Sequence, residues 1–162
     1  MDFHNRLPST FFTGSRIESE ESEPIKIVLI DASSKNIITS GPLSSIKIEI
    51  VALDGDFGAD DREDWTEKEF NTNIVREREG KRPLVTGALV ITLRNGVGYI
   101  GDLSFTDNSS WTRSRKFRLG AKVQSTSADV RIREARSEAF VVKDHRGECK
   151  FLFSESIFLY MR

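Results

Sequence analysis

The feature that most constrains this chain is a series of short alternating segments separated by strong turn signals. Over residues 89–105, apolar residues alternate with polar or smaller ones on both sides of Asn95-Gly96, a pair typical of a two-residue hairpin turn. Residues 117–123 alternate in the same way, with Gly120 and Lys122 among the residues of the opposite face. A period of two residues is that of a half-buried strand, so these segments predict a hairpin followed by a further strand.

Further strands are expected at intervals of about ten residues, with turn signals between them. They are placed at residues 24–31, 46–53, 130–133 and 139–142. One helical turn is expected at residues 65–74, where Thr66 and Glu69 have the spacing of a capping box. Many short strands without a βαβ rhythm predict an all-β fold, either a sandwich or a barrel. We take an immunoglobulin-like β-sandwich with one short helix as the expected architecture.

The length of 162 residues suits one domain. No window approaches the roughly 18 unbroken apolar residues of a membrane span. The N-terminus lacks the basic start and apolar run of a secretory signal. Cys149 is the only cysteine, so no intrachain disulfide is expected and a reducing compartment fits best.

Side chains suited to catalysis are sparse, so we expect no enzyme activity, no cofactor and no metal site. His4 and His145 have no neighbouring cluster of Cys, Ser or Asp with which to act. Residues 54–64 are acidic, but the calcium-loop pattern counted from Asp54 fails at its fifth, sixth and twelfth positions. We interpret this stretch as a solvated acidic loop, with an irregular divalent-cation site as the alternative.

Charge divides the chain into two unlike halves. Residues 1–75 contain 7 basic and 15 acidic residues, whereas residues 76–162 contain 17 basic and 10 acidic ones. The basic half is therefore the candidate surface for a polyanion. Its densest part follows the turn formers of residues 106–110, and a second basic cluster, diluted by two glutamates, occupies residues 76–82. A cationic loop suits a phosphate backbone, and a merely solvated charged face is the alternative.

Four segments carry a resemblance to a known family. They are GPLSS (41–45), NIVREREGKRPLVTG (73–87), GVGYIGDLSFTDNSSWTRSRKFRLGAKV (96–123) and RIREARSEAFVVKDHRGE (131–148). Together they resemble the central domain of the plant calmodulin-binding protein 60 family, which includes the systemic-acquired-resistance-deficient group. The resemblance divides the chain into an N-terminal tail (1–9), the family domain (10–148) and a divergent apolar tail (149–162). The chain is thus similar to a shortened member of the family.

The family resemblance implies a nuclear, sequence-specific DNA-binding transcription regulator in plant immune signalling, linked to salicylic acid. Double-stranded DNA is the expected partner, and a homodimer is a further possibility. Calmodulin is implied as well, through a segment outside this domain. The alternatives are a calmodulin-binding or adaptor module that uses the apolar tail, and a homodimerising β-domain that binds no DNA.

The expected DNA-binding residues lie in the two basic clusters. They are Arg76, Arg78, Lys81, Arg82, Trp111, Arg113, Arg115, Lys116 and Arg118. Arg113 and Arg118 are the candidates for reaching base edges, and the other cations are expected to contact phosphates. Trp111 has two interpretations, a core plug beneath the loop or a residue that stacks on a base.

Overall fold

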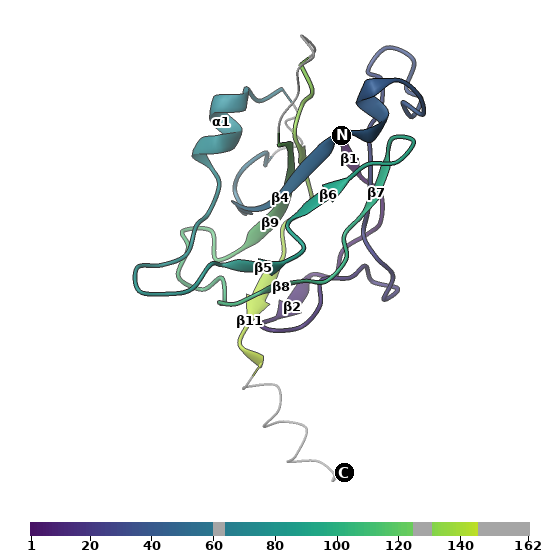
Figure 1. Cartoon of the computed structure of the whole chain (residues 1–162). Helices are drawn as coiled ribbons and strands as arrows, with labels where there is room; N and C mark the ends of the chain where they lie inside the picture. Colours follow the sequence, from purple (N-terminus) through teal and green to yellow (C-terminus); the bar gives the residue numbers. More distant parts are fainter. Residues whose placement is uncertain (60–63, 125–130, 146–162) are drawn as a thin grey trace.

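The computed structural model describes residues 1–59, 64–124 and 131–145, and this part of the chain is built mainly from short strands (Figure 1). The strands are β1 Asp2–Phe3, β2 Thr10–Phe12, β3 Lys26–Val28, β4 Lys47–Asp54, β5 Val85–Gly87, β6 Val90–Thr92, β7 Val97–Tyr99, β8 Leu103–Phe105, β9 Phe117–Val123, β10 Ala135–Arg136 and β11 Val141–Lys143. A 3-10 turn, η1, spans Pro42–Ser45, and one α-helix, α1, spans Glu67–Thr72.

The strands of the described residues form four small sheets, and one of these contains a long antiparallel pair. That pair joins β4 to β9, in register from Ile48 opposite Val123 to Asp54 opposite Phe117. It lies at the centre of the sheet β10-β9-β4-β6, and the other sheets have the orders β1-β3-β7, β11-β2 and β5-β8. The β11-β2 pair is parallel and brings the last described strand beside the start of the chain.

The main core lies on one face of β9, and its centre is aromatic. Phe105 and Phe117 stack with ring centroids 5.3 Å apart, and Phe140 meets Phe105 edge-on at 5.6 Å. All three side chains are at most 1% exposed. The alternation predicted for residues 117–123 is confirmed, because the first three alternate residues on this face of β9 are buried.

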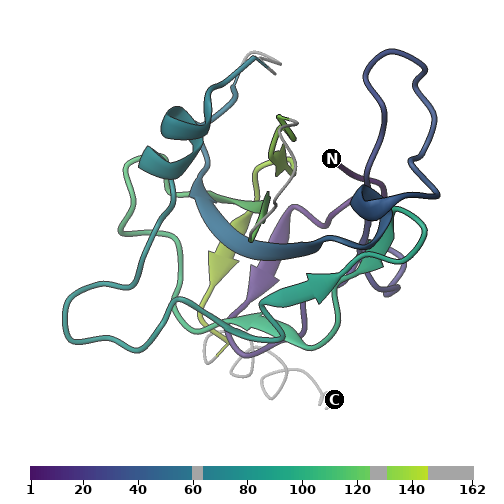
Figure 2. The ribbon, with the colours of Figure 1, turned by 45° about the horizontal axis from the view of Figure 1, so that its top comes forward.

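A second, smaller core lies on the other face of β4 and β9. Leu53, Phe57, Trp65 and Phe70 form it, and both Figure 1 and Figure 2 place α1 beside β4 and away from β7. Gly120 lets this layer approach closely, since a Cβ there would lie 2.8 Å from atoms of Leu53 and Phe70. The predicted helix cap is confirmed as well: Thr66 is the N-cap, and its Oγ1 accepts a hydrogen bond from Glu69 N at 3.1 Å.

The hairpin turn is confirmed, but the two strands separate immediately after it. Asn95 and Gly96 both have positive φ, 53° and 78°, as a type I′ turn requires, and Arg94 and Val97 exchange backbone hydrogen bonds. Beyond that bridge β6 pairs with β4, whereas β7 pairs with β3. The turn therefore connects two different sheets.

The all-β class with one short helix is confirmed for the described residues, and the immunoglobulin-like sandwich arrangement stays a prediction. The strand expected at 130–133 is wrong in its described part, because the two-residue strand β10 begins only at Ala135. Residues 1–9, expected to be a tail, contribute β1 and the buried side chains of Met1 and Leu7. The apolar tail 149–162 lies outside the described residues.

Candidate nucleic-acid interface

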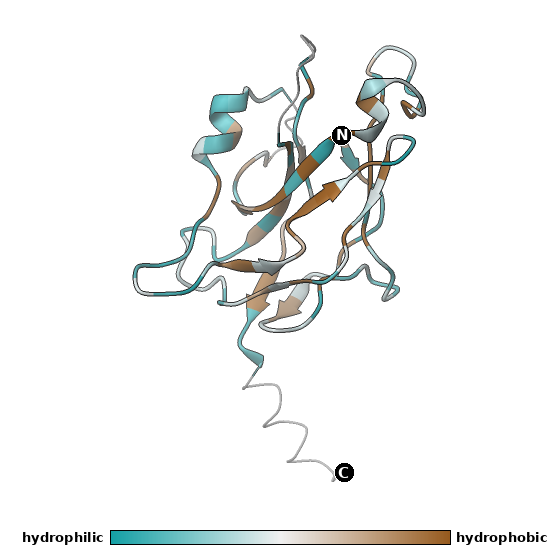
Figure 3. Cartoon of the chain, viewed as in Figure 1, coloured by the Kyte–Doolittle hydropathy of each residue, from teal (hydrophilic) through white to brown (hydrophobic). Residues whose placement is uncertain are grey.

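Two loops carry the basic clusters, and we call them the 76–82 loop and the 106–116 loop. Both project on the same side of the molecule, at the left of Figure 1, and both are hydrophilic in Figure 3. Figure 2 also shows them side by side. Two loops that are separate in sequence thus lie on one side of the fold.

One ion pair joins these loops directly. The Arg78 guanidinium donates through Nε to Asp107 Oδ2 at 2.8 Å and through Nη2 to Oδ1 at 2.9 Å. Its Cζ also lies 5.3 Å from the ring centroid of Trp111, a cation-π distance. The hydrogen bonds to Asp107 raise the pKa of Arg78 above its usual range. Arg78 is thus engaged by the protein itself, and its expected phosphate contact stays a prediction.

Trp111 fills the space beneath this ion pair. Its ring is half-buried, packs against the main core and meets Phe117 edge-on at 6.2 Å. Its Nε1 is buried and has no hydrogen-bond partner among the described residues. Because Arg78 covers one ring face, a base would have to displace Arg78 to stack there. The geometry favours the core-plug interpretation of Trp111 over the stacking one.

Hydrogen bonds fix the 106–116 loop to two strands. The buried Ser109 Oγ donates to Arg115 O at 2.9 Å and accepts from Val142 N at 3.0 Å, which anchors the loop on β11. Ser114 Oγ accepts from Gly55 N at 3.2 Å, which ties the loop to the end of β4. Arg115 itself has φ 61°, a left-handed conformation that is uncommon for a residue with a side chain. These hydrogen bonds hold the 106–116 loop in a defined position, and we call the loop held in this way a platform.

Six of the predicted residues remain exposed on these loops, and we call them the basic surface. They are Arg76, Lys81, Arg82, Arg113, Arg115 and Lys116. None of the six makes an ion pair or side-chain hydrogen bond with the part of the chain that the structure describes. Their charges are therefore available to a ligand.

Arg118 lies apart from the basic surface. It is half-buried on β9, where its Nε donates to Gly55 O and its Nη1 donates to Ser137 O, both at 2.9 Å. Burial lowers the pKa of Arg118, and the neighbouring Arg136 lowers it further. Two of the five guanidinium N–H groups are thus already used within the protein, so this geometry gives less support to Arg118 than to Arg113 as a base reader.

A third group of arginines surrounds Trp65 at the second core. The guanidinium groups of Arg133 and Arg136 lie 5.5 and 6.0 Å from the Trp65 ring centroid. Arg131 pairs with the buried Glu134, whose Oε1 also accepts from Trp65 Nε1 at 3.2 Å. These arginines serve local packing and ion pairing around the helix layer.

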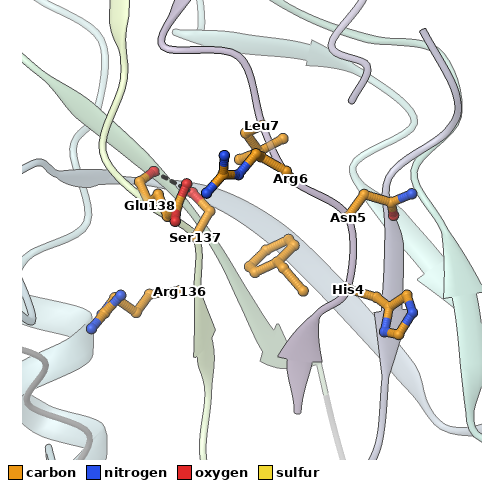
Figure 4. Close-up of a pocket in the computed structure, with 8 residues that line it drawn as sticks. His4, Asn5, Arg6, Leu7, Arg136, Ser137 and Glu138 are labelled. Atoms are coloured by element: carbon orange, nitrogen blue, oxygen red, sulfur yellow. Dashed lines mark hydrogen bonds between the residues drawn. The ribbon is translucent and has the colours of Figure 1, made fainter. Parts of the chain in front are cut away.

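A pocket of ≈ 290 Å³ lies between residues 3–7 and 136–138, and its lining includes Arg6, Arg136 and Glu138 (Figure 4). Arg6 lies near Ser137 and Glu138, while Arg136 points away from Arg6 and from His4. Across the described ranges no group of three His, Cys, Asp or Glu residues is arranged to hold a metal ion. The same residues include no helix long and apolar enough to cross a bilayer.

Asp107 is the site residue that sequence reasoning missed. In the sequence, Asp107 is interpreted only as one of the turn-forming residues 106–110. It is, however, the only acid between Thr106 and Arg118. A lone carboxylate inside a basic segment is the signal that points to a specific partner. Here that partner comes from the other basic cluster.

Fold and site together define the class as an all-β domain that displays cations on two linked, partly rigid loops. Comparison with known proteins gives the family. The profile described as calmodulin binding protein-like N-terminal domain matches residues 1–145, and the chain belongs to this family. The family resemblance predicted from the sequence is confirmed.

Three relatives illustrate the similarity. Calmodulin-binding protein 60 B of Gossypium hirsutum is 61% identical over 147 residues, covering 90% of this chain and 26% of the relative. Calmodulin-binding protein 60 B of Arabidopsis thaliana is 55% identical, covering 91% and 23%. Protein SAR DEFICIENT 1 of Arabidopsis thaliana is 51% identical, covering 90% and 32%. The chain spans about a quarter to a third of the length of these relatives, and none of the three names denotes an enzyme.

Proposed function

We propose that this domain binds double-stranded DNA with sequence preference, as part of a nuclear transcription regulator in plant immune (salicylic acid) signalling. The observation that carries the DNA-binding proposal is the basic surface, six exposed cations presented by two loops that an ion pair holds together. The regulatory setting rests on the family resemblance. No catalytic step is part of the proposal.

Electrostatics supports a polyanionic partner for this surface. The 106–116 loop presents three cations, and its one acid, Asp107, is already neutralised by Arg78. The 76–82 loop adds three more cations, offset by the exposed Glu77 and Glu79. Duplex DNA carries one negative charge per roughly 1.7 Å of helix axis, so cations gathered on one side can neutralise several phosphates at once.

The residues divide into two roles in this proposal. Arg76, Lys81, Arg82, Arg115 and Lys116 contact the phosphate backbone and fix the domain on the duplex. Arg113 is the preferred base-reading residue, because its guanidinium is exposed on the platform of the 106–116 loop. Arg78 and Trp111 support the surface from below, and Arg118 connects β9 to neighbouring segments.

A mobility-shift selection tests the proposal with the 162-residue chain and a random-sequence duplex pool. We expect enrichment of particular sequences, and we expect the variant Arg113→Ala/Arg115→Ala/Lys116→Ala to lose binding while its thermal midpoint hardly moves. A matched variant that removes three other exposed cations, Lys35→Ala/Lys47→Ala/Arg94→Ala, should retain binding. Unchanged binding by the first variant would exclude the 106–116 loop as the contact, and equal affinity for scrambled duplexes would reduce the function to non-specific attraction.

Calmodulin is the second candidate partner, favoured by the description of the family and by the names of the calmodulin-binding relatives. A calmodulin target is usually a basic amphipathic helix. The α-helix that the structure describes over its full length, Glu67–Thr72, is short and contains two acids in its first turn. Calcium-dependent capture of the chain on immobilised calmodulin decides this candidate, with capture in chelator as the control.

A homodimer is a separate candidate. Light scattering of the free chain over a salt series measures its molar mass and so reports whether it dimerises.

A further inference from the structure

The 76–82 loop depends on one side chain for its position. Among the described residues, Arg78 makes the only side-chain hydrogen bonds or ion pair that connect this loop to another segment. The other polar contact of the loop is internal, from Lys81 N to Arg78 O at 2.9 Å. The two ends of the loop are fixed by hydrogen bonds from Val75 N to Ala52 O and from Thr106 Oγ1 to Pro83 O, so Arg78 determines the position of the part between them.

Asp107 is well placed to hold it. Its side chain is only 12% exposed, and its Oδ1 also accepts a hydrogen bond from Asn108 N at 2.9 Å, so the carboxylate has a fixed orientation. Both of its oxygens bind the guanidinium fork, a geometry that lysine cannot reproduce. Trp111 below the guanidinium limits its movement on the remaining side.

We propose that Asp107 is a positioning residue for the basic surface: by binding Arg78 through both oxygens above Trp111, it holds the 76–82 loop beside the 106–116 loop so that cations of both loops engage one duplex. This inference rests on the proposed DNA binding. Asp107 itself touches no DNA in this arrangement.

The direction in which DNA affinity changes when Asp107 is neutralised distinguishes a positioning role from a purely electrostatic one. Asp107 is a negative charge next to a surface that attracts a polyanion. If charge alone mattered, its neutralisation would strengthen DNA binding. If Asp107 positions the 76–82 loop, its neutralisation frees Arg78, the part of the loop between its two fixed ends moves away from the 106–116 loop, and DNA binding becomes weaker.

The experiment uses the full chain, the variant Asp107→Asn and a duplex selected by the parent chain. We expect the variant to bind this duplex about tenfold more weakly at ~0.15 M salt, with a shallower slope of log K against log salt. The slope falls by about 0.9 for every phosphate that the domain no longer neutralises. The matched control is Asp102→Asn, which removes the same charge from an exposed pair with Arg16 at 3.8 Å. The control should leave the affinity unchanged or slightly raise it.

A second variant, Arg78→Lys, keeps the charge but loses the two-bond geometry. It should weaken binding in the same direction, and less than Asp107→Asn. Trypsin cleavage after Lys81, followed over time in the absence of DNA, reports the position of the loop independently. Cleavage should be faster in both variants and unchanged in Asp102→Asn.

Two results would overturn the inference. One is tighter binding by Asp107→Asn, and the other is an unchanged rate of cleavage after Lys81. If the parent chain selects no duplex at all, the proposed function fails, and the cleavage rates still decide whether Asp107 holds the loop. The thermal midpoint of each variant is measured as well. A midpoint equal to that of the parent shows that a change in DNA affinity or in cleavage rate does not come from unfolding of the whole domain.

Discussion

The two basic loops are alike in charge and unlike in how they are held. The 106–116 loop is fastened to β11 through Ser109 and to the end of β4 through Ser114. Between its ends, which are fixed at Val75 and Pro83, the 76–82 loop is attached through the side chain of Arg78 alone among the described residues. A ligand therefore meets one pre-organised set of cations and one set whose order depends on a single ion pair.

This difference suggests a division of labour. Reading a base requires a donor fork at a defined position, which a fixed loop supplies at little entropic cost. Phosphate contacts tolerate more variation in position, because the backbone presents the same charge along its whole length. We expect sequence preference to depend on the 106–116 loop and overall affinity to depend on both.

Among further variants that compare the two loops, the largest effect is expected when the 76–82 loop loses its exposed cations. The variant Arg76→Ala/Lys81→Ala/Arg82→Ala should weaken binding to selected and scrambled duplexes equally, by roughly a hundredfold at ~0.1 M salt. The slope of log K against log salt should fall by about 1 for each cation removed. A salt series of binding isotherms measures both. An unequal loss on the two duplexes would show that this loop reads sequence.

The platform of the 106–116 loop is tested by Ser109→Ala. The Ser109 side chain is fully buried, and its removal leaves Val142 N and Arg115 O without their partner, at a cost of about 2 kcal/mol of unfolding free energy. Ser110→Ala is the control, since its exposed hydroxyl bonds only Asn108 Oδ1 among the described residues. Chemical denaturation should separate the two variants clearly. Equal stabilities would mean that Ser109 does not anchor the loop.

Sequence preference should fall when Arg113 alone is replaced. Arg113→Ala is expected to reduce the affinity ratio between selected and scrambled duplexes by at least about 1 kcal/mol, whereas Lys116→Ala should leave that ratio intact. Competition mobility shifts measure the ratio directly. A ratio that changes with Lys116 and not with Arg113 would reverse their proposed roles.

The smallest effect is expected for Trp111→Phe. The indole Nε1 is buried without a hydrogen-bond partner among the described residues, so its removal leaves no group there unsatisfied. DNA affinity should therefore stay within about 0.5 kcal/mol of the parent, while the smaller ring loses some packing and lowers the free energy of unfolding by about 1 kcal/mol. Trp111→Ala removes the packing against Phe117 and should be clearly less stable. A marked loss of affinity in the stable Phe variant would favour base stacking by Trp111 instead.

Local patterns predicted the local structure well. Alternation identified β9, residue spacing identified the Thr66 cap, and Asn95-Gly96 identified its turn. Each of these depends on residues that are close in sequence, so the physical cause is visible in a short window. The separation of β6 from β7 was not predictable in this way, because it depends on β4 and β3, which lie far away along the chain.

The same limit applies to the candidate site. Composition identified both basic clusters, but it predicted DNA contacts for Arg78, Arg113 and Arg118 alike, with Arg78 on phosphate and the other two at base edges. The structure separates them through partners that are remote in sequence, Asp107 for Arg78 and the carbonyl oxygens of Gly55 and Ser137 for Arg118. Which arginine is free is a property of tertiary contacts, and no charge count contains that information.

The parallel pairing of β2 with β11 has a consequence for biosynthesis. Phe11 is made early, yet its partner Val142 leaves the ribosome only after almost every other described residue. Contacts so distant in sequence form slowly and late. Since Val142 also anchors Ser109, a nascent polypeptide that still lacks β11 cannot fix the 106–116 loop in this way. The translating cell thus completes the domain and its cationic loop in the same step.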